Sequence, residues 1–303
     1  MSIEAQPAAQ ASRLGGRALP GAQVLREVAR RPAGLFGLLV VVVLLLIVLF
    51  APQIAPYEAS EQAISDRLEG PSGAHLLGTD AIGRDLLSRL LFGTRIALGV
   101  AVPAVLAALF GGLLVGVIAG YLGGWVDNAL LVVMDTVQAF PAVILALAIL
   151  ALLGPSLQNV IVVIAVAFAP GYARVTRALV LATKQNLYVD AERALGAGDG
   201  RIIGTHILPN IVAPLFILLA MDLPAAITVE AGLSFLGVGV QPPTPSWGVI
   251  LADGFDRVRD TPWPVLFAGL TLMITTLGFT MLGETLRDVV DPRLAGVRRW
   301  HRG

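Results

Sequence analysis

The chain has 303 residues, of which 56% are hydrophobic and only 14% are charged. Soluble globular domains carry about 25% charged residues, so this composition excludes an ordinary soluble domain and favours a protein that crosses a membrane several times. The formal net charge is zero and cysteine is absent, which excludes both a strongly basic nucleic-acid-binding protein and a disulfide framework.

The N-terminal tail, residues 1–34, is rich in small residues and contains five arginines. An almost unbroken run of valine and leucine follows at residues 35–51. This run is longer than the roughly 7–15 apolar residues of a secretory signal peptide, and further apolar segments come after it. We therefore interpret it as a retained first transmembrane helix.

The next segment, residues 52–93, is predicted to lie outside the cell. Leucine and isoleucine recur at helical spacing between residues 86 and 96, with arginine, aspartate and serine between them. This pattern predicts an amphipathic helix that lies on the outer membrane surface. A simple connector is the alternative.

Residues 94–284 contain five further segments that approach the length of about 20 mostly apolar residues that a bilayer requires. They lie at residues 96–120, 129–153, 157–172, 211–240 and 263–283. The fourth is the shortest, because the breaker pair Pro170-Gly171 predicts that its helix ends there. The sequence thus predicts an all-α, polytopic membrane protein with about six transmembrane helices.

The basic residues predict the orientation of these spans. Fifteen of the 21 lysine and arginine residues lie in three segments. These are the N-terminal tail, the stretch between the fourth and fifth spans, and the C-terminal tail, residues 285–303. Basic residues near span ends favour the cytoplasm, and six spans place all three segments on one side. We therefore expect both termini to be cytoplasmic.

The stretch YVDAERALGAGDGRIIGTHILPN, residues 188–210, lies in that cytoplasmic loop. It is too polar to cross a membrane, and its small side chains suggest a short helix that ends at Gly196 and Gly198. A short helix with small side chains suits insertion into a groove of a partner protein. From the pattern alone, a cap without any partner is the alternative.

This stretch resembles the EAA loop of importer-type ABC permeases. The family pattern is E-A-A, three residues, glycine, nine residues, and a hydrophobic turn that ends in Leu-Pro. Here Asp190-Ala191-Glu192 is followed by three residues, Gly196, nine residues and a turn ending at Leu208-Pro209. Aspartate for the first glutamate and Glu192 for the second alanine are departures, which bear on the detailed docking surface.

Four further blocks are similar to the C-type subunit of dipeptide/oligopeptide/nickel ABC permeases. They are LLGTDAIGRDLLSRLLFGTRIAL at residues 76–98, GGWVDNALLVVMD at 123–135, EAGLSFLGVGVQPPTPSWGVILADG at 230–254 and LRDVVDPR at 286–293. Any one block alone is weak evidence, whereas together they are highly specific. The resemblance extends over residues 35–293, nearly the whole chain.

The resemblance implies a type I ABC importer permease fold in the inner membrane of a bacterium or archaeon, with residues 94–284 as the permease domain. A homologous permease subunit, two ATP-binding subunits and an extracytoplasmic substrate-binding protein are its implied partners, besides membrane lipid. The implied cargo is a dipeptide or oligopeptide; nickel or another small solute is the alternative. The residues implied to couple to the ATPase are Asp190, Ala191, Glu192, Ala194, Leu195, Gly196 and Ala197.

The chain itself is not expected to bind or hydrolyse ATP. A P-loop ends in Gly-Lys-Ser/Thr, but the sole lysine, Lys184, lies between Thr183 and Gln185. ATP and magnesium are therefore expected on the partner subunits, and we predict no catalytic residue and no cofactor in this chain. The three histidines are not at metal-ligand spacing from one another, so no metal site is predicted either.

Asp222 and Glu230 are costly residues in the predicted fifth span, so they are candidates for function. They lie eight residues apart, which places them about 80° apart on one broad helix face. Either could line a hydrated pathway or bind the ammonium group of a peptide. The alternative is a structural role, in which the acid forms a hydrogen bond between helices. An ion-coupled secondary transporter is a weaker alternative, since such proteins often show internal repeats and this chain shows none.

Overall fold

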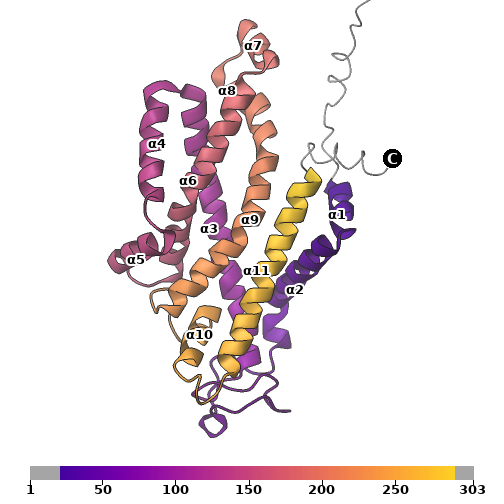
Figure 1. The fold of residues 1–303 in the computed structure, drawn as a ribbon, viewed down its shortest axis with the longest axis vertical. Coiled ribbons are helices and arrows are strands. Elements are labelled where there is room, and N and C mark those ends of the chain that lie inside the picture. The colour runs from indigo at the N-terminus through magenta and orange to yellow at the C-terminus, as the bar shows by residue number, and fades with distance from the viewer. Residues whose placement is uncertain (1–20, 291–303) are drawn as a thin grey trace, which may run out of the picture.

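The structure of the chain is a computed structural model that describes residues 21–290, and the regular elements in this range are helices. In chain order (Figure 1) they are α1 (Gly21–Ala29), α2 (Pro32–Ile54), the 3₁₀ helix η2 (Ile64–Asp66), α3 (Leu86–Leu122), α4 (Gly124–Gln138), α5 (Ala142–Leu153), α6 (Leu157–Lys184), α7 (Leu187–Ala194), α8 (Asp199–Ile202), the π-helical turn η3 (Ile203–Ile207), α9 (Leu208–Phe235), α10 (Trp247–Phe255) and α11 (Trp263–Val290).

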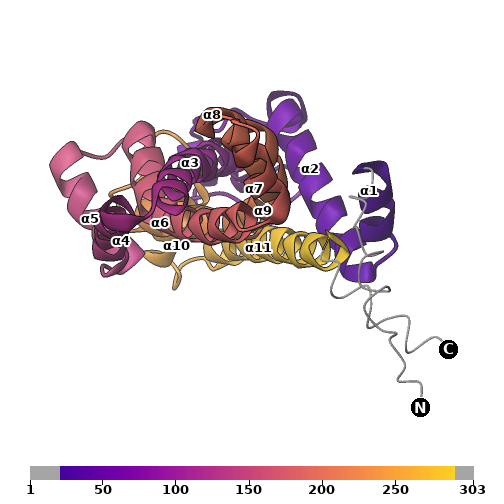
Figure 2. The same cartoon turned by 90° about the horizontal axis from the view of Figure 1, so that it is seen from above.

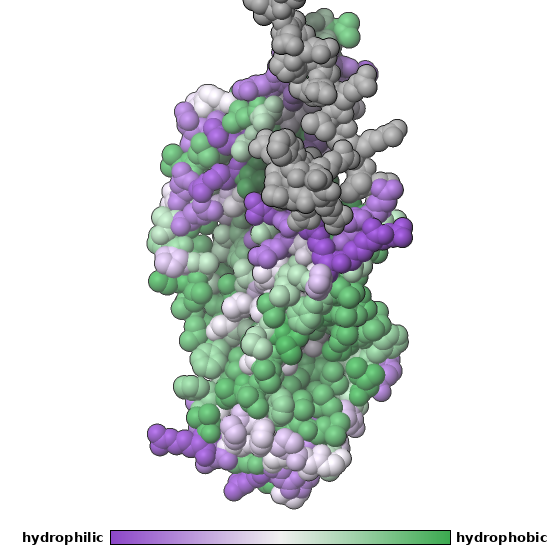
Figure 3. All heavy atoms as spheres, turned by 45° about the vertical axis from the view of Figure 1, so that its right-hand side comes forward, coloured by the Kyte–Doolittle hydropathy of each residue, from purple (hydrophilic) through white to green (hydrophobic). Residues whose placement is uncertain are grey.

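The predicted all-α membrane fold is confirmed. Five of the described helical segments are long and apolar enough to cross a bilayer, and the number rises to six if the bent pair α4–α5 counts as one span. Hydrophobic side chains form a broad band around the visible face of the molecule, with hydrophilic side chains above and below it (Figure 3). We call the two ends the α7 end and the α10 end, after the short helices that lie there (Figure 1).

The third and fourth predicted spans differ most from the structure, and a proline lies at each of these two differences. The predicted third span is divided into α4 and α5, which meet at 89°, and Pro141 is the N-cap of α5. The predicted fourth span instead continues to Lys184, with Pro170 inside α6. Pro170 is buried among neighbouring helices, which can satisfy the backbone group that proline leaves unpaired, so the helix is not broken.

The predicted amphipathic surface helix is not a separate element. Residues 86–96 are the first turns of α3, a continuous helix of 37 residues. Asp85 caps the start of this helix by accepting a hydrogen bond from the Ser88 amide at 2.8 Å. Ser88 and Arg89 are buried, since they pair with the preceding segment and do not face water. The alternation of polar and apolar residues therefore reflects buried ion pairs.

Helices also extend into both segments that were predicted as terminal tails, residues 1–34 and 285–303. The N-terminal tail contains α1, and α2 begins at Pro32; at the other end α11 extends to Val290. Residues 1–20 and 291–303 lie outside the described part of the chain. Arg31 donates a hydrogen bond to Asp288 at 3.3 Å, so the start of α2 is attached to the end of α11.

Helices α3 and α6 pack closely because glycines recur every fourth residue along α3. Gly112, Gly116 and Gly120 all face the backbone of α6. A Cβ atom on Gly112 would lie only 2.6 Å from the Ala169 carbonyl oxygen, and one on Gly116 would lie 2.5 Å from the Ala173 carbonyl oxygen. Small residues at such positions allow the close backbone approach that stabilises helix pairs in membranes.

The remaining helices surround this pair. Viewed from the α7 end, α1 and α2 lie on one side of the molecule and α4 and α5 lie on the other (Figure 2). Helix α2 contacts α11 through glycines, since a Cβ atom on Gly37 would lie 2.5 Å from the Gly278 carbonyl oxygen. Helix α10 is a short element that packs against α3, α9 and α11.

Two buried arginines, the buried Asp80 and the half-buried Asp253 form an ion-pair network at the α10 end. Asp80, which precedes α3, accepts a hydrogen bond from Arg84 Nε at 2.6 Å and another from Arg89. Both arginines also donate to Asp253 of α10, at 3.2 and 3.3 Å. The buried Trp247 of α10 donates through Nε1 to the Leu90 carbonyl oxygen at 3.1 Å. These bonds attach α10 to the first turns of α3.

Candidate coupling and pathway site

The loop that carries the predicted coupling residues forms the α7 end of the molecule, between α6 and α9 (Figure 1). Gly196 ends α7 in a left-handed conformation with φ +83°. Its amide donates to the Arg193 carbonyl at 2.9 Å, and the Ala197 amide donates to the Glu192 carbonyl at 3.0 Å. This pair of bonds is a Schellman motif, which favours glycine at this position because other residues are strained there.

The loop has a buried side and an exposed side. Val189, Ile202 and Ile207 are fully buried and fix α7, α8 and η3 against the helices below. Leu187 and Leu195, at the two ends of α7, are 86% and 83% exposed. Exposed apolar side chains on an ordered helix are available for contact with a partner protein.

Most of the predicted coupling residues lie on the exposed side. Asp190, Ala191, Ala194, Leu195 and Gly196 are exposed. Glu192 and Ala197 are half-buried, and the Glu192 carboxylate lies 3.6 Å from Nε2 of His206. The residues are therefore brought together on one short segment, and their role in docking stays a prediction.

The two predicted pathway acids have different surroundings. Asp222 is half-buried near the middle of α9 and interacts electrostatically with Tyr172 of α6. Glu230 is completely buried, and its Oε1 accepts hydrogen bonds from Ser234 at 2.8 Å and from Ser246 at 2.9 Å. Since Ser246 is the N-cap of α10, Glu230 attaches α10 to α9.

Two ion pairs connect α4 with α6. Arg177 donates two hydrogen bonds to Asp127, at 2.5 and 2.6 Å. Arg174 donates one to Asp135 at 2.7 Å, and both side chains of this second pair are more than half exposed. Asp135 thus has a structural partner.

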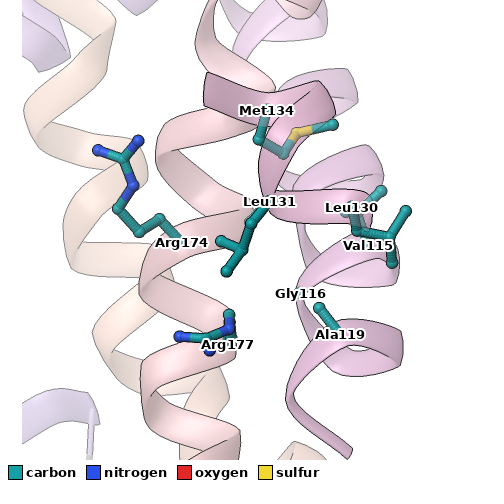
Figure 4. A pocket seen from close by; sticks show the side chains of 9 residues that line it. Val115, Gly116, Ala119, Leu130, Leu131, Met134, Arg174 and Arg177 are labelled. Carbon is teal, nitrogen blue, oxygen red and sulfur yellow. The ribbon is translucent and has the colours of Figure 1, made fainter. Parts of the chain in front are cut away.

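A small cavity lies between α3, α4 and α6 beside these arginines, with Val115, Leu131 and Met134 in its wall (Figure 4). Its volume of about 10 Å³ is that of roughly one water molecule, so it cannot hold a transported solute. Within residues 21–290, no group of three histidine, aspartate or glutamate side chains is placed to hold a metal ion.

Comparison with known proteins places the chain in a family. The model of the binding-protein-dependent transport system inner membrane component matches residues 112–296, and the N-terminal transmembrane domain of oligopeptide transport permease C matches residues 20–71. The chain belongs to this permease family. It is a multi-pass membrane subunit of the ABC importer type, as its sequence predicted.

Curated relatives of the permease are similar over almost their whole length. A dipeptide transport system permease of Alkalihalophilus pseudofirmus is 39% identical, over 91% of this chain and 90% of that protein. A glutathione transport system permease of Pectobacterium atrosepticum is 40% identical over 89% of each chain. A di/tripeptide transport system permease of Pseudomonas aeruginosa is 40% identical, over 88% of this chain and 90% of that protein.

The fold of the permease is also that of a solved transporter. A methionine ABC transporter in inward-facing conformations aligns with a TM-score of 0.54 and 18% identity, over 68% of this chain and 98% of the solved chain. At this identity the likeness concerns the fold alone. It confirms the importer-permease architecture that the resemblance implied.

Sequence reasoning missed the residues through which the permease holds its loop. Tyr121 of α3 donates a hydrogen bond to Asp199 of α8 at 2.5 Å, and Lys184 donates to two carbonyl groups of α3. Tyr121 and Asp199 are 78 residues apart, and no spacing pattern relates them. The only available signal was Lys184, as the sole lysine of the chain.

The structure supports the structural reading of Glu230 and makes it testable. We expect Glu230→Gln to retain most transport activity, because the amide oxygen can still accept both serine hydroxyl bonds. Glu230→Ala should lower activity and thermal stability together, since two buried hydroxyl groups would lose their acceptor. Uptake by membrane vesicles would measure transport activity, and thermal unfolding of the purified permease would measure stability. Loss of uptake in Glu230→Gln at normal melting temperature would assign the negative charge to the pathway.

Proposed function

We propose that this permease forms one half of the translocation pathway of an ATP-driven peptide importer and couples to a separate ATPase through α7. The coupling assignment rests on the exposed leucines at the two ends of α7, Leu187 and Leu195, and on the buried Val189 that fixes this helix to the bundle. Dipeptide, di/tripeptide and glutathione permeases at about 40% identity support peptides as the substrate class. Glutathione is itself a short peptide, so one substrate chemistry accounts for all three relatives.

Coupling follows from the way in which the loop is attached. Helix α7 is joined by the chain to α6 on one side and, through α8 and η3, to α9 on the other. A partner that binds Leu187, Leu195 and the turn at Gly196 and then moves would displace the ends of both helices together. This is a rigid-body transmission between a nucleotide site on the partner and the membrane bundle.

The polar face of α4 and α6 supports a second membrane subunit. The ion pair between Arg174 and Asp135 is more than half exposed, although it lies on helices of the membrane bundle. A charged side chain facing lipid at mid-span costs about 2.5–3.5 kcal/mol on insertion scales. A homologous permease packed against this face, with a hydrated pathway between the subunits, would remove that cost. Asp222 is our candidate for contact with the ammonium group of a peptide.

The remaining assignments follow from the same arrangement. Helices α1, α7 and the end of α11 lie toward one end of the molecule, which supports cytoplasmic termini on the ATPase side (Figure 1). The opposite end, with α10, would meet the extracytoplasmic substrate-binding protein. The chain has no P-loop, so ATP and magnesium would bind to two partner subunits and the permease would be non-catalytic.

Co-purification tests the docking assignment. Deletion of residues 190–198 should abolish recovery of the ATPase with the tagged permease. Leu195→Asp, at an exposed position that leaves the fold unaffected, should lower recovery more than about tenfold, because it places a charge in an apolar contact. Leu195→Met is the matched control and should retain the ATPase. Full recovery with both the deletion and Leu195→Asp would disprove docking through α7.

A further inference from the structure

Tyr121 connects the coupling loop to a helix that does not adjoin it in the sequence. It lies in the last turn of α3, where its ring is largely buried. Its hydroxyl donates to Asp199 Oδ1 of α8 at 2.5 Å. The guanidinium group of Arg193, in the last turn of α7, lies over the ring at 5.7 Å from the centroid, within the range of a cation–π contact. One side chain of α3 therefore contacts both short helices of the loop.

Lys184 strengthens this attachment from the other side. Its Nζ donates to the carbonyl oxygens of Gly120 and Tyr121, at 3.0 and 3.1 Å. The last carbonyl groups of a helix have no partner within it, and a positive charge there also complements the helix dipole. The end of α3 is thus bound by α6, by α7 and by α8, although the sequence joins the loop only to α6 and α9.

Helix α3 is long enough to carry motion from one end of the bundle to the other. Its 37 residues correspond to a length of about 55 Å. Glycines hold it against α6 along its cytoplasmic half, so the two helices have little room to slide past one another. At its far end Arg89 and Leu90 hydrogen-bond to Asp253 and Trp247 of α10.

We propose that Tyr121 is a positioning residue that transmits displacement of the coupling loop to α3 and, through α3, to α10. The proposal rests on the proposed function, because it requires that α7 docks on an ATPase. The alternative is that Tyr121 only stabilises the loop. These roles differ in outcome: a stabilising contact affects docking and melting, whereas a transmitting contact affects the response of α10 while docking is intact.

The absence of cysteine from the chain allows a direct measurement. Phe255, in the last turn of α10, is 61% exposed and can be replaced by cysteine as a single labelling site. The full complex in proteoliposomes is treated with ATP and vanadate, which holds the ATPase closed, and labelling of the permease by a membrane-impermeant maleimide is timed. With Tyr121 present, we expect the labelling rate to change at least about fivefold on trapping, because closure shifts the populations of more and less exposed positions of α10.

Tyr121→Phe removes the hydroxyl and retains the ring beneath Arg193. We expect it to abolish most of the change at Phe255→Cys while ATPase recovery and trapped nucleotide stay normal. Asp199→Ala should act in the same way, whereas Asp199→Asn should be close to the parent because its amide oxygen can still accept the bond. Tyr57→Phe is the matched control, since it loses a bond to the Ala74 carbonyl far from the loop.

Each result decides the proposal. It is overturned if the labelling change in Tyr121→Phe equals that of the parent, if trapping causes no change even with Tyr121 present, or if Tyr121→Phe releases the ATPase. Failure of the proposed function would be recognised separately, as normal ATPase recovery with the 190–198 deletion.

Discussion

Gly112→Ala should strongly destabilise the permease. The new Cβ atom would lie 2.4 Å from the Tyr172 Cβ and 2.6 Å from the Ala169 carbonyl oxygen, so α3 and α6 would have to separate. Overpacking of this kind typically costs about 1–3 kcal/mol, and contact with backbone atoms leaves little scope for relief by side-chain rotation. We expect lower abundance in the membrane and a lower melting temperature in detergent, measured by thermal unfolding of the purified protein.

The neighbouring residue provides the matched control. Gly111 has no atom within 4 Å of its Cβ position and is exposed. Gly111→Ala should therefore leave stability unchanged or raise it by about 0.5–1 kcal/mol, because alanine loses less conformational entropy in a helix than glycine does. Equal melting temperatures for the two variants would mean that α3 and α6 are not in close backbone contact.

Asp80→Asn should have a comparably large effect at the opposite end of the molecule. Asp80 is 2% exposed, and its loss of charge leaves Arg84 and Arg89 with only the more exposed Asp253 as an acidic partner. Removal of one member of a buried ion pair typically costs about 3–5 kcal/mol, because the remaining charge is left unpaired in a poorly solvated site. The melting temperature should fall, and protease should cleave the segment before α3 more readily.

Asp256→Asn is the control for this change. It removes the same charge from an exposed position just after α10, so we expect no measurable loss of stability. If Asp80→Asn melted at the same temperature as Asp256→Asn, the network would not contribute to the attachment of α10. The hydrogen bond from Trp247 to the Leu90 carbonyl would then be the remaining polar link between α10 and α3 described above.

The sequence predicted what depends on composition and local spacing. Long apolar runs indicate spanning helices because a bilayer offers no other partner to the backbone, and the glycine spacing of residues 188–210 indicated the exposed loop. Proline was a poor guide to helix ends, because exposed Pro141 lies at the bend between α4 and α5, whereas buried Pro170 lies inside a continuous α6. The helices that pack around Pro170 come from distant parts of the chain.

Polar residues in apolar surroundings were misread for the same reason. Arg89 was assigned to a solvent-facing surface, since no helical spacing relates it to Asp80, nine residues earlier, and nothing local shows that Asp253, 164 residues away, is its second partner. The link from Tyr121 to Asp199 was equally invisible. The packing of the helices determines which charged and hydrogen-bonding side chains meet across a bundle. These partners cannot be identified from a single sequence when the packing is unknown.

Helix α2 has a consequence for how the permease responds to its lipid environment. It has 23 residues, which corresponds to about 35 Å, and only 17% of its most apolar stretch is buried. This length slightly exceeds a hydrocarbon thickness of about 30 Å, and a spanning helix can relieve such a mismatch by tilting. Because α2 packs chiefly against α11, with close approach at Gly37 and Gly278, we expect a change in bilayer thickness to shift this peripheral helix more than the transport core.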